Sequence, residues 1–111
     1  MRLRTDLWVA AFLRRCASAN LAVYLRRRGA PEAGAIFVKI DRLDGSAALY
    51  APAPQSEARD DVARLFSRAH QDEWIENAAV EQRLVKELDF DPDLWIVEVE
   101  DRAGQVLLDL A

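Results

Sequence analysis

Acidic residues are concentrated near the C-terminal end of the chain, in the segment DFDPDLWIVEVED at residues 89–101. Glu98 and Glu100 lie two positions apart, so on a β-strand their side chains emerge on one face about 7 Å apart. Carboxylates at such a spacing can bind Mg²⁺ or Mn²⁺, or act as an acid–base pair. Nuclease sites place a lysine beside acids of this kind. No lysine follows here at strand spacing, and the nearest in sequence is Lys86.

The same acids have a structural interpretation, which we favour. Asp91 and Asp93 flank Pro92, and acids in that position commonly form turns. Glu98 and Glu100 would then face water near the end of a strand. We therefore expect no metal site, no cofactor and no catalytic residue, and a divalent ion bound by Glu98 and Glu100 would overturn this interpretation.

A second group of residues would place aromatic rings and cations together on one face of a sheet. Its members are Tyr24, Phe37, Tyr50, Arg26, Arg28 and Lys39. Rings interleaved with cations can stack and neutralise single-stranded nucleic acid. The alternatives are that a helix covers this face, or that the rings support cross-strand pairs. The formal charge of −4 argues against nucleic acid as the partner.

Three consecutive arginines end the first predicted strand, and only Arg26 and Arg28 would project to the same face. They could pair within the fold or bind an acidic partner or phosphate, and internal pairing is the expectation we favour. The candidate binding surface therefore comprises Tyr24, Arg26, Arg28, Phe37, Lys39, Asp91, Asp93 and Glu98.

Several kinds of chemistry lack the residues they need. One cysteine and one histidine, Cys16 and His70, cannot form an intramolecular disulfide or a common structural zinc set. We expect Cys16 to be a small core residue and His70 to lie in a polar connection. Four glycines form no phosphate-binding loop. The cysteine usage favours a reducing cytoplasm.

The first half of the chain is predicted to form one helix and three strands. Trp8, Phe12 and Cys16 recur at helical spacing, which predicts a helix over 5–19 with Thr5 as its N-cap. The N-terminal segment resembles a secretory signal, but its apolar run is short: Asp6 precedes it, and Arg14 and Arg15 lie where it should continue. Alternating segments at 21–26, 35–42 and 46–51, with a tight turn at Asp44-Gly45, predict a three-stranded meander.

The second half is predicted to add a helix and at least one strand. A polar, proline-containing loop spans 51–61, and 62–69 fits either a helix face or a strand. Strong helix formers predict a helix over 72–90, with Glu81 facing solvent, ended by Pro92. Residues 94–100 alternate as a strand. The tail turns at Ala103-Gly104 and continues as a last strand or a docked turn.

These elements predict a single α+β domain spanning residues 1–111, in which an antiparallel sheet of four or five strands packs one face against two helices. We expect no membrane-spanning segment, since no apolar stretch is long enough. The predicted core consists of Trp8, Phe12, Leu13, Val23, Leu25, Ile36, Val38, Ile40, Leu49, Trp74, Val85, Leu88, Trp95, Val97 and Val99.

The segments LWVAAFLRRC, RRRGAPEAGAIFVKI and DPDLWIVEVED resemble a small bacterial family known as domain of unknown function fourteen ninety-one. The string Asp91-Pro92-Asp93-Leu94-Trp95 and the arginine-then-glycine hairpin with Arg28, Gly29 and Gly34 carry most of the resemblance. The resemblance implies a cytoplasmic domain and favours a strand over a helix for RLFSRA, residues 64–69. It supplies no activity and no catalytic residue.

The absence of a catalytic constellation makes a non-enzymatic interaction module our leading hypothesis. Its partner would be another protein or a second copy of the chain. The apolar C-terminal run VLLDL also supports this hypothesis. The alternative is single-stranded nucleic-acid binding, or metal-dependent processing, on the basic and aromatic face.

Overall fold

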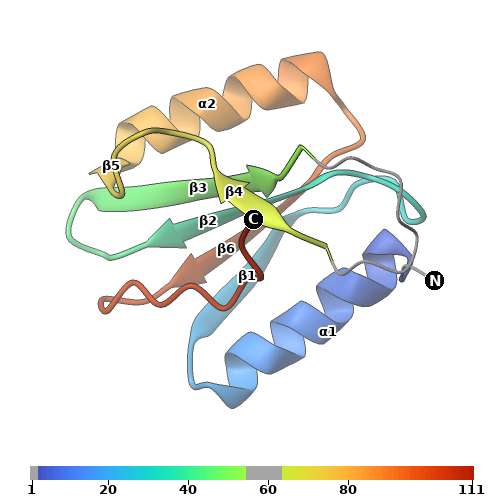
Figure 1. Cartoon of the computed structure of the whole chain (residues 1–111), viewed down its shortest axis with the longest axis horizontal. Coiled ribbons are helices and arrows are strands. Elements are labelled where there is room, and N and C mark those ends of the chain that lie inside the picture. Colours follow the sequence, from blue (N-terminus) through green and yellow to red (C-terminus); the bar gives the residue numbers. More distant parts are fainter. Residues whose placement is uncertain (1–2, 55–63) are drawn as a thin grey trace.

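The computed structural model describes residues 3–54 and 64–111, which form two helices and a six-stranded sheet (Figure 1). The helices are α1 (Thr5–Ser18) and α2 (Asn77–Phe90). The strands are β1 (Ala22–Arg27), β2 (Ile36–Asp41), β3 (Ser46–Pro52), β4 (Phe66–Arg68), β5 (Ile75–Glu76) and β6 (Trp95–Glu100). The predicted α+β class is confirmed, with one or two strands more than expected.

The order of the strands differs from the predicted meander. The sheet runs β1-β6-β2-β3-β4, and β5 pairs with β3. The last strand, β6, lies between β1 and β2, antiparallel to β1 and parallel to β2. The meander was therefore wrong at its first step, because β1 and β2 are not neighbours. A central position suits β6, since its WIVEV segment is apolar on both faces at its start and such strands are buried on both sides.

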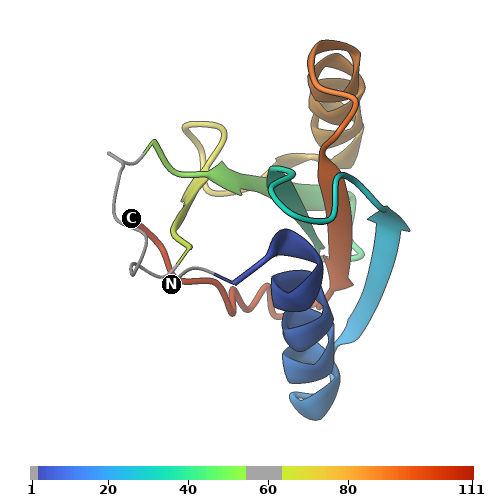
Figure 2. The same ribbon diagram turned by 90° about the vertical axis from the view of Figure 1, so that its right-hand side faces the viewer.

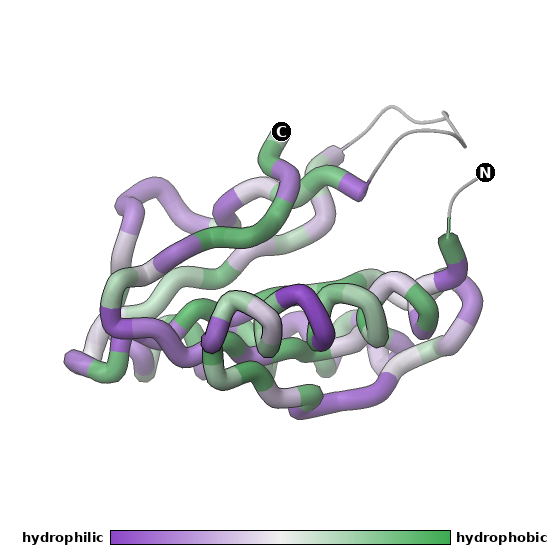
Figure 3. Tube along the Cα trace, turned by 90° about the horizontal axis from the view of Figure 1, so that it is seen from below, coloured by the Kyte–Doolittle hydropathy of each residue, from purple (hydrophilic) through white to green (hydrophobic). Residues whose placement is uncertain are grey.

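The two helices cover opposite faces of the sheet, which corrects the prediction that both pack on one face. Val9, Phe12 and Cys16 of α1 pack with alternate strand residues such as Val38 and Val97. The intervening strand residues pack with Val80 and Leu84 of α2; they are Phe37, Ala47, Leu49 and Ile96. We call these two sides the α1 face and the α2 face. Figure 2 shows the sheet between the helices. In Figure 3, where α1 faces the viewer, hydrophobic and hydrophilic positions are interleaved along the helix and along the strands.

Three local predictions were wrong. The second helix begins at Asn77 and not at residue 72, because Ile75 and Glu76 pair with β3. Thr5 does not cap α1; it is fully buried, and its hydroxyl donates to the Gly34 carbonyl at 3.1 Å. Val85 is 59% exposed on α2 and so does not belong to the core.

The C-terminal run pairs with the edge strand β4 at Phe66. Leu108 is buried in the core on the α1 face, and Val106 and Leu107 pack against it partly buried, so much of the run that suggested an interaction surface is used within the fold. The Phe66 amide donates to the Asp109 carbonyl, and the Ala111 amide donates to the Phe66 carbonyl, both at 2.9 Å. The tail thus pairs with β4 as a docked segment. In the described part of the chain, neither helix combines the length and apolarity needed to cross a membrane.

Candidate functional site

A charged cluster occupies the part of the α2 face that α2 leaves open. Lys39 and Asp41 of β2 lie in register with Glu98 and Glu100 of β6, because the two strands are parallel. Tyr24 of β1 lies opposite Glu98. The helix contributes one acid. We define the cluster as Tyr24, Arg26, Lys39, Asp41, Glu81, Glu98 and Glu100.

Glu81 joins the helix to the sheet through both cations of the cluster. The Lys39 ammonium donates to Glu81 at 2.6 Å, and the Arg26 guanidinium donates to both Glu81 oxygens at 2.8 and 2.9 Å. The Lys39 side chain is only 4% exposed. Hydrogen bonds from Arg26, and then from Lys39, lower the pKa of Glu81 to about 2 despite partial desolvation. Glu81 was predicted to face solvent, so this role was missed.

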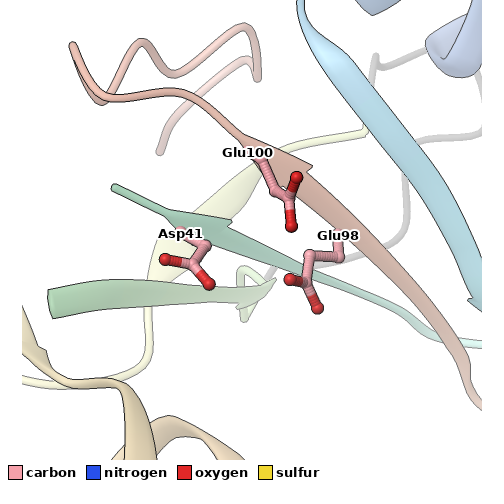
Figure 4. A group of neighbouring side chains, drawn as sticks. All are labelled: Asp41, Glu98 and Glu100. Atoms are coloured by element: carbon pink, nitrogen blue, oxygen red, sulfur yellow. The ribbon is translucent and has the colours of Figure 1, made fainter. Parts of the chain in front are cut away.

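Three acids of the cluster converge in space. Carboxylate oxygens of Asp41, Glu98 and Glu100 lie within 4.8 Å of one another, as Figure 4 shows. Oxygen ligands of this kind suit hard divalent cations. The Lys39 ammonium already lies 3.8 Å from Glu98 and 4.0 Å from Asp41. A cation from the chain itself therefore offsets part of this charge.

A lysine does lie beside the acids, which the sequence pattern did not predict. The spacing along β6 contains no lysine, yet Lys39 faces Glu98 from the neighbouring strand. Asp41 was missed for the same reason. The only sequence signal was that Lys39 and Asp41 share one face of their own strand.

The predicted aromatic platform is not assembled. Phe37 is 7% exposed and packs beneath α2, whereas Tyr50 is 4% exposed and lies on the α1 face opposite Val38. Only Tyr24 remains half exposed, with its hydroxyl donating to Glu100 at 3.2 Å. That bond raises the pKa of Tyr24. No stack of rings is open to bases among these three residues.

The other predicted site residues form a separate structural corner at the start of β6. The Arg28 guanidinium lies 5.2 Å from the centre of the Trp95 ring, whose indole N–H donates to the Ala30 carbonyl at 2.8 Å. Asp91 accepts the backbone amide of Asp93 at 2.9 Å, which is the turn role expected for it. Arg26, by contrast, pairs with Glu98 at 3.0 Å, as the internal-pairing prediction allowed.

Two glycines explain why the hairpin and the DPDLW string occur together. A Cβ at Gly29 would meet the Asp93 carbonyl oxygen and lie 2.6 Å from the Leu94 carbonyl carbon. A Cβ at Gly34 would lie 2.9 Å from the Trp95 ring. The loop between β1 and β2 therefore packs directly on the backbone of the string. This close approach gives both segments a structural role.

His70 and Cys16 also have structural roles. His70 is 9% exposed; its Nε2 accepts the Leu49 amide at 3.0 Å, and its Nδ1 donates to the Asp72 carbonyl at 2.7 Å. Desolvation lowers the pKa of His70. Cys16 is fully buried in the α1-face core, as predicted.

The outer edge of β1 has backbone groups that the sheet does not use. The Trp95 amide donates to the carbonyl of Ala35, just before β2, and the Asp101 amide donates to the carbonyl of Asp41 at its end. The backbone N–H and C=O groups of odd-numbered β6 residues therefore point toward β2, and those of even-numbered residues point toward β1. Tyr24 faces Glu98, so its backbone N–H and C=O groups are hydrogen-bonded to β6. The N–H and C=O groups of Val23 and Leu25 therefore point away from the sheet. Among the described residues, Figure 2 shows no helix or strand on the outer side of β1.

Comparison with known proteins places the chain in a family. The family model described as protein of unknown function (DUF1491) matches residues 3–109. The chain belongs to the DUF1491 family. No curated protein is significantly similar to it.

Solved structures agree with this assignment. The solution structure of protein Atu0922 from A. tumefaciens is 36% identical, with a TM-score of 0.84, and the match covers 100% of this chain and 96% of that one. The crystal structure of a DUF1491 family protein from Caulobacter crescentus CB15 is 30% identical, with a TM-score of 0.80 and coverage of 100% and 99%. An NMR structure of a DUF1491 family protein from the same organism is 31% identical, also at 0.80, with coverage of 100% and 98%.

Proposed function

We propose that this DUF1491 protein is a non-enzymatic interaction module that receives an extended polypeptide strand along the outer edge of β1. The outward N–H and C=O groups of Val23 and Leu25 carry the proposal. An edge strand with such groups is a template for a further strand, and main-chain hydrogen bonds then supply the affinity. The single buried cysteine is compatible with action in a reducing cytoplasm.

The contrast between the two edges of the sheet supports this choice. At β4 the chain's own tail supplies a pairing segment, through the Phe66–Leu110 bridge and the hydrogen bonds beside it. At β1, the outward backbone groups of Val23 and Leu25 have no hydrogen-bond partner in a turn, a loop or the tail among the described residues. Natural sheets usually protect such an edge. Arg26 and Arg27 do so at one end only, because Ala22–Leu25 carries no charge.

Single-stranded nucleic acid has less support as the ligand. Phe37 and Tyr50 are buried, so the rings needed for stacking are not on the surface. Arg26 and Lys39 are paired with acids, and the cluster holds four carboxylates against two cations. Such a surface repels phosphate.

A photo-crosslinking amino acid at position 24 tests the proposal in cells that express the protein. The same group at position 85, an exposed apolar position on α2, is the matched control. We expect an adduct from position 24 whose crosslinked peptide maps to one extended segment of the partner. The adduct should disappear when Val23→Pro is added. Absence of an adduct, or one that ignores Val23→Pro, would contradict the proposal.

The proline variant also tests the backbone directions on which the proposal depends. Val23→Pro removes an N–H that points outward, so the pairing of β1 with β6 should survive. Tyr24→Pro, one residue later, removes an N–H that points to β6 and should cost about 2 kcal/mol more in unfolding free energy. Circular dichroism and urea unfolding of both variants give the comparison.

A further inference from the structure

We infer that the strand received at the β1 edge belongs to a second copy of this chain, paired antiparallel with Tyr24 facing Tyr24 across a two-fold axis. This inference rests on the proposed function and names its partner. An isologous contact of this kind uses the same edge of both copies. It extends the sheet continuously from one copy into the other.

The backbone of β1 admits this register and excludes its neighbours. With Tyr24 at the axis, Val23 of each copy faces Leu25 of the other, and both have outward N–H and C=O groups. The two pairs would form four hydrogen bonds. An axis at Val23 would require Leu21, whose amide already donates to the Cys16 carbonyl at 3.0 Å. An axis at Leu25 would require Arg27, which lies beyond a break in the β1–β6 register.

The side chains complement one another in the same register. On the α1 face, Val23 lies beside Leu25 of the second copy, and both are partly buried hydrophobic residues next to the core. Antiparallel pairing puts the arginines of the two copies at opposite ends, so that they do not repel. On the α2 face, Arg26 of the second copy lies opposite Ala22.

That position brings a cation toward the acidic side of the cluster. Glu100 faces Ala22 within one copy, so Arg26 of the second copy would stand two strand spacings from Glu100, about 10 Å between Cα atoms. Ala22 is small, and long side chains can approach each other over it. Arg26 is held by Glu81 and Glu98 in its own copy, so its charge would act on Glu100 of the other copy as a longer-range attraction, and this attraction favours a second copy as the occupant.

Cysteine substitution tests the register directly in the purified full chain. Residues facing each other in a non-hydrogen-bonded antiparallel pair have Cα atoms about 4.5 Å apart, which a disulfide can bridge. We expect Tyr24→Cys to form a disulfide-linked dimer under mild oxidation. Ala22→Cys is the control, since its two copies would lie roughly 14 Å apart, beyond disulfide reach. Native Cys16 is buried and gives the background.

Sedimentation equilibrium provides a second measurement. The unmodified protein should dimerise with concentration, and Tyr24→Lys should weaken the dimer by about tenfold or more, because two like charges would face each other at the axis. Val85→Lys adds the same charge at an exposed position on α2 and should leave dimerisation unchanged. Equal weakening by both variants would overturn the inference.

The outcomes separate this inference from the proposed function. A strict monomer, together with a position-24 adduct to another protein, would refute the second copy and leave the interaction module standing. A strict monomer with no adduct would refute both. A dimer that crosslinks through Ala22→Cys as readily as through Tyr24→Cys would refute the β1 register.

Discussion

The ammonium group of Lys39 in β2 lies 2.6 Å from the carboxylate of Glu81 in α2, although the two residues are 42 positions apart in the sequence. Among the described residues, Lys39 is the only lysine, arginine, aspartate or glutamate that is buried. A buried ammonium needs a charged partner, since water cannot reach it freely. The Lys39–Glu81 pair therefore links α2 to the sheet, beside the apolar packing of Val80 and Leu84.

Glu81→Gln should lower the unfolding free energy by about 1–2 kcal/mol, because it removes the nearest of the three acids around a buried lysine. The loss stays below that of a fully buried pair, since the Glu81 side chain is 37% exposed and partly screened. Urea unfolding measures it. Glu73→Gln removes the same charge from an exposed residue and should change stability little. Equal losses in the two variants would contradict this account.

Acid should destabilise the protein through the same carboxylate. The pKa of Glu81 is lowered from 4.5 to about 2 in the folded state, so the unfolded chain binds its proton first as the pH falls. The stability that the ion pairs contribute is complete above 4.5 and is lost as the pH falls toward about 2. Glu81→Gln should have a flatter stability curve over that range, measured by urea unfolding at several pH values. Parallel curves would count against the assignment.

Gly29→Ala should destabilise the corner at the start of β6. The added Cβ meets the Asp93 carbonyl and the Leu94 backbone, which cannot move aside without shifting the strand. We expect a loss of about 2–3 kcal/mol in thermal or urea unfolding. Gly45→Ala is the comparison: its Cβ would meet no atom, and only the positive φ of 91° imposes a cost, about 1 kcal/mol. A smaller loss at Gly29 than at Gly45 would be inconsistent with the packing.

Trp95→Phe should cost about 1–2 kcal/mol beyond the effect of its smaller ring, because the indole hydrogen bond to the Ala30 carbonyl is lost. Trp74→Phe is a suitable control. Trp74 also has an arginine over its ring, Arg42 at 4.2 Å, but no indole hydrogen bond is found among the described residues. Similar losses at both positions, measured by urea unfolding, would mean that the hydrogen bond adds nothing.

Local patterns in the sequence determined most of the elements. The apolar spacing of α1, the alternation of β1 and β2, and the Asp44-Gly45 turn all correspond to observed structure. Residues 66–68 form a strand, as the family resemblance favoured, while 62 and 63 lie outside the described residues. These features depend on neighbours within a few positions, where period and turn chemistry are informative.

Tertiary structure alone decided which strands are neighbours and therefore which charges meet. β6 enters between β1 and β2, and this brings Lys39 beside Glu98 and leaves β1 as an edge. One signal was available in the sequence: β2 and β6 are apolar on both faces for much of their length, which requires a helix on each side. Pairing between distant strands is set by burying both faces at once, and no local period encodes that.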